Sequence, residues 1–443
     1  MFANFSVQEA HIPIWEGDWR YCFLMGGRGN GRSGTAARYV VSQLLGKEYT
    51  RGAIMRATRE DIRTSSWRDI NDLIEEQKIV GRFRVVNNDM HLEHGQNSIN
   101  AHGFRASSGS LTARLKSLAG YNLVWIEEAE EIGENEFTVL DDSLRTIKGR
   151  IKIIFSLNTP SKSHWIIKRW FDLVESEYKG FFIPQLKKEI KDTLYIPGTY
   201  ESNLINIDPA TAERYESYKN TKPSYYYQLI RGLCPEVVLG RIYSGWQEID
   251  SIPHEARLMG YGLDFGFDPD EAALVAVYYH NRGYLLDEKI YATRLLNENL
   301  AAHIKLLPPA PIIADSAEPK SIEEMNLYGL NIIPCVKGPD SVNFGIKLVQ
   351  GLKISYTKTS VNLKKEYENY AWKINKDGED TGIEDPKCAN HLLTAARYYL
   401  ADTIKANADP EAELRKSQEE RLMLAKHRKE FNSTRKSRYG LAQ

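Results

Sequence analysis

The sequence has few cysteines, and their spacing fits neither a zinc site nor a disulfide framework. The four lie far apart among 443 residues, at Cys22, Cys234, Cys335 and Cys388. Zinc-binding cysteines come in closely spaced pairs, and disulfide frameworks belong to short secreted chains. We therefore expect four buried thiols.

Long apolar runs are also absent. No stretch approaches the roughly 20 apolar residues that a membrane-spanning helix needs. The first residues, MFANFSVQEAHIPIW, lack the basic start and the continuous apolar segment of a secretion signal. We therefore expect a protein that stays in the cytoplasm, is not secreted and has no membrane partner.

An excess of charge of either sign is missing too. The formal net charge is −1 at pH 7, with 26% charged and 42% hydrophobic residues, as in ordinary globular proteins. A nucleic-acid-binding protein of this charge must concentrate its lysines and arginines locally. Residues 421–443 do so, with seven basic residues against one acid, Glu430. The seven are Arg421, Lys426, Arg428, Lys429, Arg435, Lys436 and Arg438.

The length of the chain is too great for one ordinary core and predicts two domains with connecting elements. In residues 1–200, apolar strand-like runs at 20–25, 52–55, 122–126 and 151–157 alternate with helical patterns. This alternation predicts an α/β domain whose parallel sheet is covered by helices on both faces.

The rest of the chain follows other patterns. Residues 201–250 are rich in tyrosine and interrupted by proline, which predicts a small helical linker. In 251–405, the runs MGYGLDFG, AALVAVYYH and GYLLDEKIY are separated by short turns and are expected to pair antiparallel. A strand at 311–315 and a last helix at 388–404 complete a pattern typical of an RNase H-like fold. Residues 406–443 are expected to form a charged helix and a basic tail.

A glycine-rich segment, GGRGNGRS, joins the first strand to the first long helix. It fits the phosphate-loop pattern G-x-x-x-x-G-K-[ST], except that Arg32 replaces the lysine. Backbone N–H groups of such a loop bind phosphates at a helix N-terminus, and Ser33 is placed to hold Mg²⁺. The predicted ATP-binding residues are Gly26, Gly27, Arg28, Gly29, Asn30, Gly31, Arg32 and Ser33. A glycine-rich surface turn is the alternative.

Two further strand ends favour the ATP site over that alternative. The run LVWIEE ends in Glu127, predicted to position Mg²⁺, and Glu128, predicted to orient the attacking water. Acid pairs at strand ends are often only solvated, but here the pair follows a phosphate loop in consistent topology. One strand later, Asn158 in SLNTP can contact the γ-phosphate or the water.

Together, the GGRGNG loop, WIEEA at 125–129 and SLNTP at 156–160 resemble the ATPase motifs of phage terminase large subunits. The resemblance extends over residues 5–403. It implies a P-loop ATPase domain of the RecA/ASCE type, a loop arginine at Arg28 and an adenine-reading glutamine at Gln8. It also implies that the region of Arg114 and Lys116 supplies a catalytic arginine to a neighbouring subunit.

The resemblance implies a packaging motor. Such a protein would hydrolyse ATP with Mg²⁺ to move double-stranded DNA through a portal protein into a procapsid, and would cut concatemeric DNA. A small terminase subunit would choose the DNA site for packaging. Copies of the chain would form a pentameric ring when docked on the portal, and the isolated chain would be a monomer. It would act in the host cytoplasm and transiently at the portal. Residues 421–443 would then bind DNA or an acidic portal surface, or would be a solvated tail.

Two aspartates in the second domain predict a nuclease site. Asp264 ends the first strand of this domain and Asp315 ends a later one, and in RNase H-like folds these strand ends are neighbours. Carboxylates there can bind Mg²⁺ or Mn²⁺ ions that activate water. The setting of both residues resembles the terminase nuclease motifs.

The third acid of that site is missing from its usual place. In NHLLTAARY the family carries an aspartate three residues after the histidine, where this chain has Thr394. A threonine hydroxyl is a poor Mg²⁺ ligand compared with a carboxylate. Asp385 or Asp380 could supply the ligand, His391 and water could complete the shell, or the nuclease could be weakened.

Two other functions remain open from the sequence. A helicase or repair ATPase with a nuclease-like domain would need a second RecA-like domain, and the C-terminal half has no second phosphate loop. An assembly protein with decayed catalytic sites is favoured by Arg32 and Thr394.

Overall fold

The computed structural model describes residues 6–105, 115, 118–267, 271–338, 340–375 and 379–408. The chain divides into two compact units, Met1–Gly240 with Ile374–Thr381, and Arg241–Lys373 with Gly382–Gln443. Most of the predicted linker therefore groups with the first unit. Arg114, Lys116 and the basic segment 421–443 lie outside the described residues.

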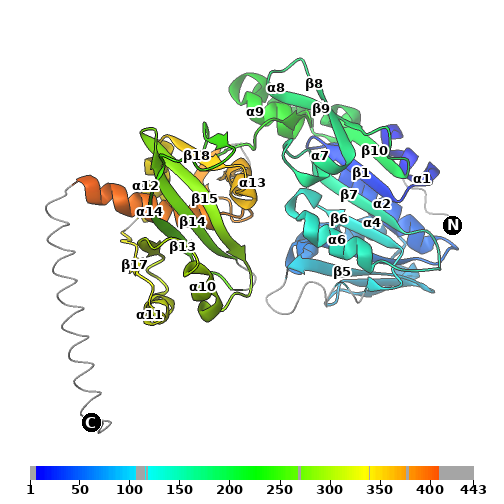
Figure 1. Cartoon of the computed structure of the whole chain (residues 1–443). Helices are drawn as coiled ribbons and strands as arrows, with labels where there is room; N and C mark the ends of the chain where they lie inside the picture. Colours follow the sequence, from blue (N-terminus) through cyan, green and yellow to red (C-terminus); the bar gives the residue numbers. More distant parts are fainter. Residues whose placement is uncertain are drawn as a thin grey trace, which may run out of the picture. The chain divides into compact units, whose positions relative to one another are not determined.

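The first unit is built on an eight-stranded sheet in the order β10-β1-β7-β6-β2-β5-β4-β3 (Figure 1). Its strands are β1 (Tyr21–Gly26), β2 (Arg51–Thr58), β3 (Arg84–Val86), β4 (His91–His94), β5 (Asn97–Arg105), β6 (Leu123–Glu127), β7 (Lys152–Asn158) and β10 (Thr193–Gly198). Neighbours from β10 to β5 are parallel, whereas β4 and β3 pair antiparallel at one edge. The predicted parallel sheet is confirmed.

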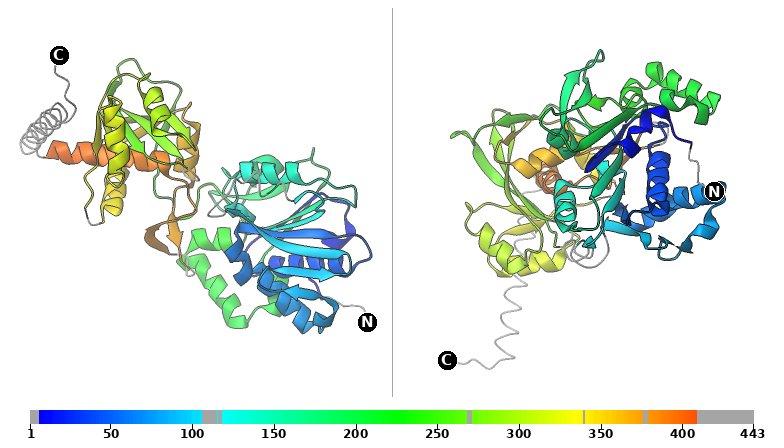
Figure 2. Two further views of the ribbon diagram at one scale, coloured as in Figure 1. Left: turned by 90° about the horizontal axis from the view of Figure 1, so that it is seen from below. Right: turned by 90° about the vertical axis from the view of Figure 1, so that its right-hand side faces the viewer.

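Helices cover both faces of this sheet (Figures 1 and 2). Successive side chains of a strand point to opposite faces, and here both sets are apolar. Leu24 belongs to the core formed with α2 (Arg32–Leu45) and α4 (Ser66–Glu76). Its neighbour Phe23 belongs to the core formed with α6 (Glu134–Ser143) and α7 (Trp165–Trp170). Short elements complete this part: η1 (Glu9–His11), α1 (Pro13–Glu16), α3 (Arg59–Thr64), η2 (Val80–Arg82) and η4 (Ala129–Glu131).

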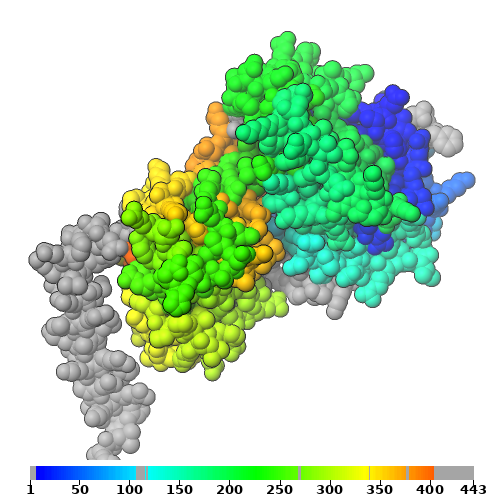
Figure 3. Space-filling view, turned by 45° about the horizontal axis from the view of Figure 1, so that its top comes forward, coloured from blue at the N-terminus to red at the C-terminus, as the bar shows by residue number. Residues whose placement is uncertain are grey.

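A tyrosine-rich region completes the first unit. Its helical part has a small core of its own, formed by Tyr200, Tyr218, Tyr225, Tyr226 and Ile230. Figure 3 shows the green surface of this region beside the blue-green segment that precedes it in the chain. The elements are β8 (Phe171–Glu175), β9 (Phe181–Leu186), η5 (Tyr200–Asn206), α8 (Pro209–Thr221), α9 (Pro223–Tyr225), η6 (Tyr226–Ile230) and β11 (Cys234–Pro235).

The second unit has a seven-stranded sheet in the order β12-β18-β15-β14-β13-β16-β17. Three consecutive strands form the predicted antiparallel meander, and β16 then pairs parallel with β13. This topology confirms the RNase H-like fold. The strands are β12 (Gln247–Ile249), β13 (Arg257–Asp264), β14 (Ala272–His280), β15 (Gly283–Ala292), β16 (Ile312–Ala314), β17 (Ile332–Pro334) and β18 (Ile354–Thr357). A separate two-stranded sheet, β19 (Trp372–Ile374) and β20 (Asp380–Glu384), includes residues assigned to both units.

Helices lie on both faces of the second sheet as well. One core contains residues of α10 (Asn297–Ile304) and α11 (Pro319–Leu327), and the other contains residues of α12 (Ser341–Gln350), α13 (Val361–Asn369) and α14 (His391–Ala408). No helix in the described part of the chain has the length and apolar character needed to cross a membrane. Three cysteines are buried as predicted, and Cys388 is partly exposed.

Candidate active sites

The glycine-rich loop links β1 to α2, at the carboxyl end of the parallel strands. Gly31 directly precedes α2. Its φ of +78° is a left-handed backbone conformation, which favours glycine. Gly27 has no room for a side chain, because a Cβ there would lie 1.8 Å from the carbonyl oxygen of Ile230. The loop therefore has the position predicted for it, between β1 and α2, and its binding of phosphate stays a prediction.

Arg32, which stands in the lysine position of the motif, turns back into the loop. Its Nη1 donates to the carbonyl oxygens of Gly26 (3.2 Å) and Gly27 (3.1 Å). Its Nη2 donates to Oδ1 of Asn158 (2.8 Å) at the end of β7. The guanidinium thus places its positive charge inside the site, where a nucleotide phosphate would be attracted.

The predicted magnesium residues are in direct contact. Ser33 Oγ donates to Oε1 of Glu127 at 2.5 Å. The other oxygen of this buried carboxylate accepts hydrogen bonds from Trp125 Nε1 (3.1 Å) and from Ser156 Oγ. With one oxygen held by β6 and β7, Glu127 presents the other to Ser33. A hydroxyl and a carboxylate oxygen are ligands that Mg²⁺ accepts, and these two would have to move from 2.5 Å to about 3 Å apart to bind one ion between the loop and the strand.

Glu128 differs sharply from its neighbour. It has φ +50°, a left-handed conformation that costs a non-glycine residue about 1–3 kcal/mol. The turn leaves the Glu128 side chain 40% exposed and pairs it with Nη2 of Arg56, while Glu131 Oε1 lies 3.6 Å from the same nitrogen. Glu128 is therefore the acid of this strand end that water can reach. Arg56 was not predicted, although a single arginine in the apolar strand AIMRAT is a usable signal.

Asn158 is held at both ends of its amide. Its Oδ1 accepts from Arg32, and its Nδ2 donates to Oε1 of Glu130 at 2.8 Å. Burial raises the pKa of Glu130, and the charge of Arg32 offsets this only in part. The second N–H of Nδ2 and the second lone pair of Oδ1 are the groups through which Asn158 would contact a γ-phosphate or the attacking water, as predicted.

Arg28 and Gln8 contact different residues around the loop. Arg28 Nη1 donates to the hydroxyl of Tyr225 at 2.6 Å, so its side chain turns toward the tyrosine-rich region. Gln8 packs against the loop, since a Cβ on Gly31 would lie 2.3 Å from its Nε2. Among the described residues, none forms a hydrogen bond with its buried Oε1. That oxygen suits an adenine amino group, whereas the nucleotide role of Arg28 stays a prediction.

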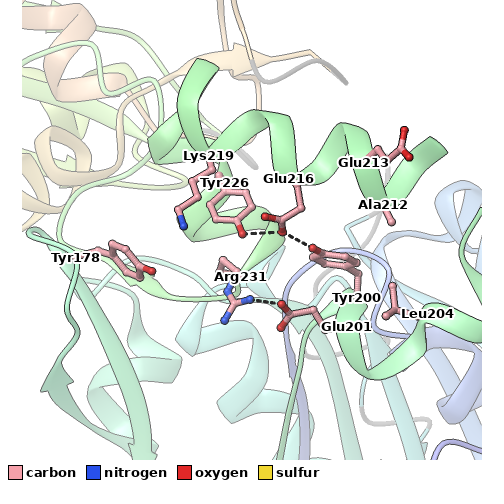
Figure 4. Close-up of a pocket in the computed structure, with 10 residues that line it drawn as sticks. All are labelled: Tyr178, Tyr200, Glu201, Leu204, Ala212, Glu213, Glu216, Lys219, Tyr226 and Arg231. Carbon is pink, nitrogen blue, oxygen red and sulfur yellow. Dashed lines mark hydrogen bonds and ion pairs between the residues drawn. The ribbon is translucent and has the colours of Figure 1, made fainter. Parts of the chain in front are cut away.

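A cleft in the tyrosine-rich region lies close to the glycine-rich loop, because Tyr200, which lines it, packs against Gly29 (Figure 4). It has a volume of about 720 Å³ and contains the hydroxyls of Tyr200 and Tyr226, which both donate to Glu216, and the ion pair between Arg231 and Glu201 (2.6 Å). None of the predicted ATP-binding residues lines it. The cleft therefore does not coincide with the predicted phosphate site.

In the second unit, the two predicted nuclease aspartates are neighbours. Leu263 pairs with Ala314 in the parallel register of β13 and β16, so Asp264 and Asp315 stand at adjacent strand ends. Helix α14 can approach β13 closely because Gly262 has no side chain; a Cβ there would lie 1.9 Å from the carbonyl oxygen of Ala395. This approach brings the helix side chains onto the two aspartates.

Asp264 contacts the first residue of α14. His391 Nδ1 lies 3.2 Å from Asp264 Oδ2, and His391 Nε2 lies 3.3 Å from Glu271 Oε2. Burial raises the pKa of Asp264, and the hydrogen bond with Asp264 raises the pKa of His391. The sequence did not indicate Glu271, which precedes β14 and looks like an ordinary turn acid.

Asp315 is surrounded by donors. Lys337 forms an ion pair with Oδ1, the Ala317 N–H donates to Oδ1 at 2.7 Å, and the Tyr398 hydroxyl donates to Oδ2 at 2.8 Å. Burial alone would raise the pKa of Asp315, but these three bonds lower it overall. Asp315 is therefore held ionised, with the Lys337 ammonium beside it.

Thr394 and Asp385 make other contacts. The buried Thr394 hydroxyl accepts from Arg397 Nη2 at 3.2 Å, and Arg397 in turn pairs with Glu384 (3.1 Å). Asp385 Oδ1 accepts from the Lys387 N–H at 3.0 Å. The proposed metal role of Asp385 stays a prediction.

Within the part of the chain that the structure describes, no three His, Cys, Asp or Glu side chains converge on one point. The predicted nuclease residues form a pair, Asp264 with His391, and Asp315 lies at the adjacent strand end. A carboxylate oxygen and an imidazole nitrogen form a donor set that suits Mn²⁺. The residues thus fit one divalent ion at Asp264 and His391, and a second at Asp315 would have to displace Lys337.

Two family profiles match most of the chain. The profile described as phage terminase large subunit matches residues 19–233, and the profile described as terminase RNase H-like domain matches residues 264–402. The PBSX phage terminase large subunit of Bacillus subtilis strain 168 is 25% identical over 419 residues, 89% of this chain and 92% of its own.

A second relative and a solved structure are also similar over most of the chain. The large terminase subunit of Bacillus phage SPP1 is 25% identical over 409 residues, 86% of this chain and 91% of its own. The solved large terminase of a thermophilic bacteriophage is 17% identical and covers 89% of this chain and 98% of that one, with a TM-score of 0.42.

Proposed function

This chain belongs to the phage terminase large subunit family and functions in DNA packaging, and from that premise we propose that it hydrolyses ATP in its first unit and cuts DNA in its second. The two activities would serve one process. Hydrolysis moves double-stranded DNA through a portal into a procapsid, and cutting separates the packaged length from a concatemer.

The proposed ATP site lies at the carboxyl ends of β1, β6 and β7. Loop N–H groups and Arg32 bind the phosphates, Ser33 and Glu127 hold Mg²⁺, and Gln8 reads the adenine. Glu128 accepts a proton from the attacking water, because its carboxylate is the exposed one at this strand end. The bound ion neutralises charge on the phosphates.

The contact of Ser33 with Glu127 is the observation that carries this proposal. It joins residues 94 positions apart, one in the glycine-rich loop and the other at the end of β6. A solvated surface turn and an unrelated pair of acids would have no reason to meet. The test is ATP hydrolysis by the purified protein, with and without double-stranded DNA. Absence of hydrolysis in both conditions would contradict the proposal.

The proposed nuclease site uses Asp264, His391 and Asp315. A divalent ion, Mg²⁺ or Mn²⁺, would activate water and stabilise the leaving oxygen. Asp264 and His391 would hold the ion, and Asp315 would bind on the adjacent strand end once Lys337 moves. The side chain of Lys337 would then be available to a DNA phosphate.

Incubation of supercoiled plasmid with the protein tests the nuclease. We expect cleavage with Mn²⁺, weaker cleavage with Mg²⁺, none with EDTA, and none for Asp264→Ala. Intact plasmid under every condition would instead favour a motor without a working nuclease, in line with the loss of the usual acid at Thr394 and the ion pair of Lys337 with Asp315.

The partners follow from this function. Contacts with DNA would be made mainly to phosphates, so binding should weaken steeply with salt and depend little on sequence. We propose that the chain docks on a portal protein as a ring, a pentamer, is a monomer in isolation, and receives DNA chosen by a small terminase subunit. It would act in the host cytoplasm.

A further inference from the structure

Glu271 occupies a place that the proposed nuclease function does not yet explain. Its carboxylate lies against the far nitrogen of His391, whose near nitrogen lies against Asp264. We propose that Glu271 is a positioning residue for the metal site: it accepts the Nε2–H of His391, so that Nδ1 presents its lone pair to the ion held with Asp264. This inference rests on the proposed nuclease function.

The sheet register places Glu271 on the correct face. Asp264 pairs with Ala273 across the antiparallel strands β13 and β14, and paired residues share a face. Glu271 directly precedes β14, and its contact with His391 places its carboxylate on the same face as Asp264. Helix α14 covers that face and begins with His391. The three side chains are therefore brought together by backbone geometry.

The distances match a metal ligand and its supporting carboxylate. Two ligands about 2.1 Å from one ion in octahedral geometry are about 3 Å apart. His391 Nδ1 and Asp264 Oδ2 are 3.2 Å apart, so little movement is needed for both to bind one ion. On the other side of the ring, the 3.3 Å from Nε2 to Glu271 Oε2 is a hydrogen-bond distance.

The chemistry requires such a partner. A neutral imidazole carries its hydrogen on one nitrogen only, and the hydrogen bond made by the other nitrogen decides which one can bind metal. Histidine ligands accordingly donate their free N–H to a carboxylate or carbonyl. Thr394 is bonded to Arg397 and supplies no carboxylate, so the orientation of His391 as a ligand matters more than it would beside a third carboxylate.

Metal binding tests the proposal directly. Isothermal titration of the full-length protein with MnCl₂ should show a roughly 10–100-fold weaker affinity for Glu271→Ala, the usual effect of removing a supporting carboxylate. Glu271→Gln should stay within about threefold of wild type, because its carbonyl oxygen can still accept the Nε2–H. Pulsed EPR of the bound Mn²⁺ should detect nitrogen coupling in the wild type and in Glu271→Gln, and should lose it in Glu271→Ala.

Glu255 provides a matched control. It lies beside the opposite end of β14 and contacts His280 Nε2 at 3.2 Å, the same type of pair away from the site. Glu255→Ala should leave the Mn²⁺ affinity and the EPR signal unchanged. A comparable loss in this variant would show a general effect on folding and would overturn the positioning role.

The remaining outcomes separate this inference from the proposed function. If Glu271→Gln binds Mn²⁺ as poorly as Glu271→Ala, Glu271 is itself a ligand and the positioning role is wrong. If Glu271→Ala keeps wild-type affinity while Asp264→Ala loses it, only the inference fails. If wild type shows no Mn²⁺ binding and Asp264→Ala changes nothing, the nuclease proposal fails and this inference with it.

Discussion

Glu128→Gln offers the sharpest test of the ATP site, because it replaces one oxygen by an amide nitrogen and changes little else. Glu128 is the exposed acid at the end of β6, and it is proposed to take a proton from the attacking water. An amide cannot accept that proton. Loss of a general base lowers turnover by about 10²- to 10⁴-fold. We expect ATP hydrolysis to fall by at least the lower of these factors.

The structural cost of this change is small. The substituted glutamine would still present a carbonyl oxygen to Arg56, and Arg56 keeps Glu131 at 3.6 Å together with hydrogen bonds to Asp61 O and Ser65 Oγ. A partly exposed ion pair contributes about 1 kcal/mol or less. In a domain of about 200 residues this lowers the melting temperature by less than about 4 °C. ATP binding should persist, because Ser33 and Glu127 pair with each other.

Glu131→Gln is the matched control. It also removes one carboxylate charge from Arg56, but its side chain is only 5% exposed and cannot reach the water. Phosphate release should therefore fall in Glu128→Gln alone, while fluorescent-nucleotide titration gives similar affinities for both variants and wild type. A wild-type rate in Glu128→Gln would show that the acid was wrongly assigned. Equal losses of ATP hydrolysis in both variants would show that activity depends on the ion pairs of Arg56 and that Glu128 is not a general base.

Further predictions concern other parts of the chain. Arg32→Ala should weaken ATP binding roughly 10–100-fold, because it removes a charged hydrogen bond worth about 1.5–3 kcal/mol. Arg32→Lys should keep the affinity for ATP. Equal affinities of Arg32→Ala and wild type in a nucleotide titration would exclude the phosphate contact. Thr394→Asp should raise Mg²⁺-supported plasmid cutting, and an unchanged rate would mean that its carboxylate pairs with Arg397 instead. Burial lowers the pKa of His164 to about 4, below its usual 6.5. The unfolded chain therefore gains this proton first, so between about pH 7 and about pH 5 the unfolding free energy of wild type should fall by up to about 2 kcal/mol more than that of His164→Asn in urea titrations. Burial also lowers the pKa of His102, so both proteins should lose some stability. Deletion of 421–443 should weaken DNA or portal binding at low salt, and unchanged binding to both would leave a solvated tail.

The strand ends could be predicted because their positions follow from local patterns. An apolar run that ends in an acid or a glycine marks where a buried strand leaves the sheet, and carboxyl ends of parallel strands meet at one edge. Ser33, Glu127 and Asn158 are thereby placed near each other by alternation of strands and helices alone. Asp264 was placed beside Asp315 by the RNase H-like pattern of the second domain, in which these two strand ends are neighbours. The predictions of the ATP site and of the nuclease site depended on which strands are neighbours and did not depend on side-chain contacts.

The partners of these residues could not be predicted in the same way. Arg56 meets Glu128 across 72 positions, and Glu130 meets Asn158 across 28. Each contact depends on which strands are neighbours and on the local backbone, as the left-handed turn of Glu128 shows. A single charged residue in an apolar strand indicates that some partner exists. It does not indicate which one.

Arg32, which replaces the lysine of the phosphate-loop pattern, is best understood together with the residues that it contacts. At position 32, a lysine has one nitrogen, whereas the guanidinium reaches the Gly26 and Gly27 carbonyls and Asn158 together. Asn158 then turns its amide nitrogen to Glu130, whose burial the nearby charge of Arg32 offsets in part. Removing the arginine charge therefore leaves Glu130 without its main compensation. For this reason Arg32→Ala should affect Asn158 as well as the phosphates, and restoring a charge with lysine should repair the binding of ATP more fully than its hydrolysis.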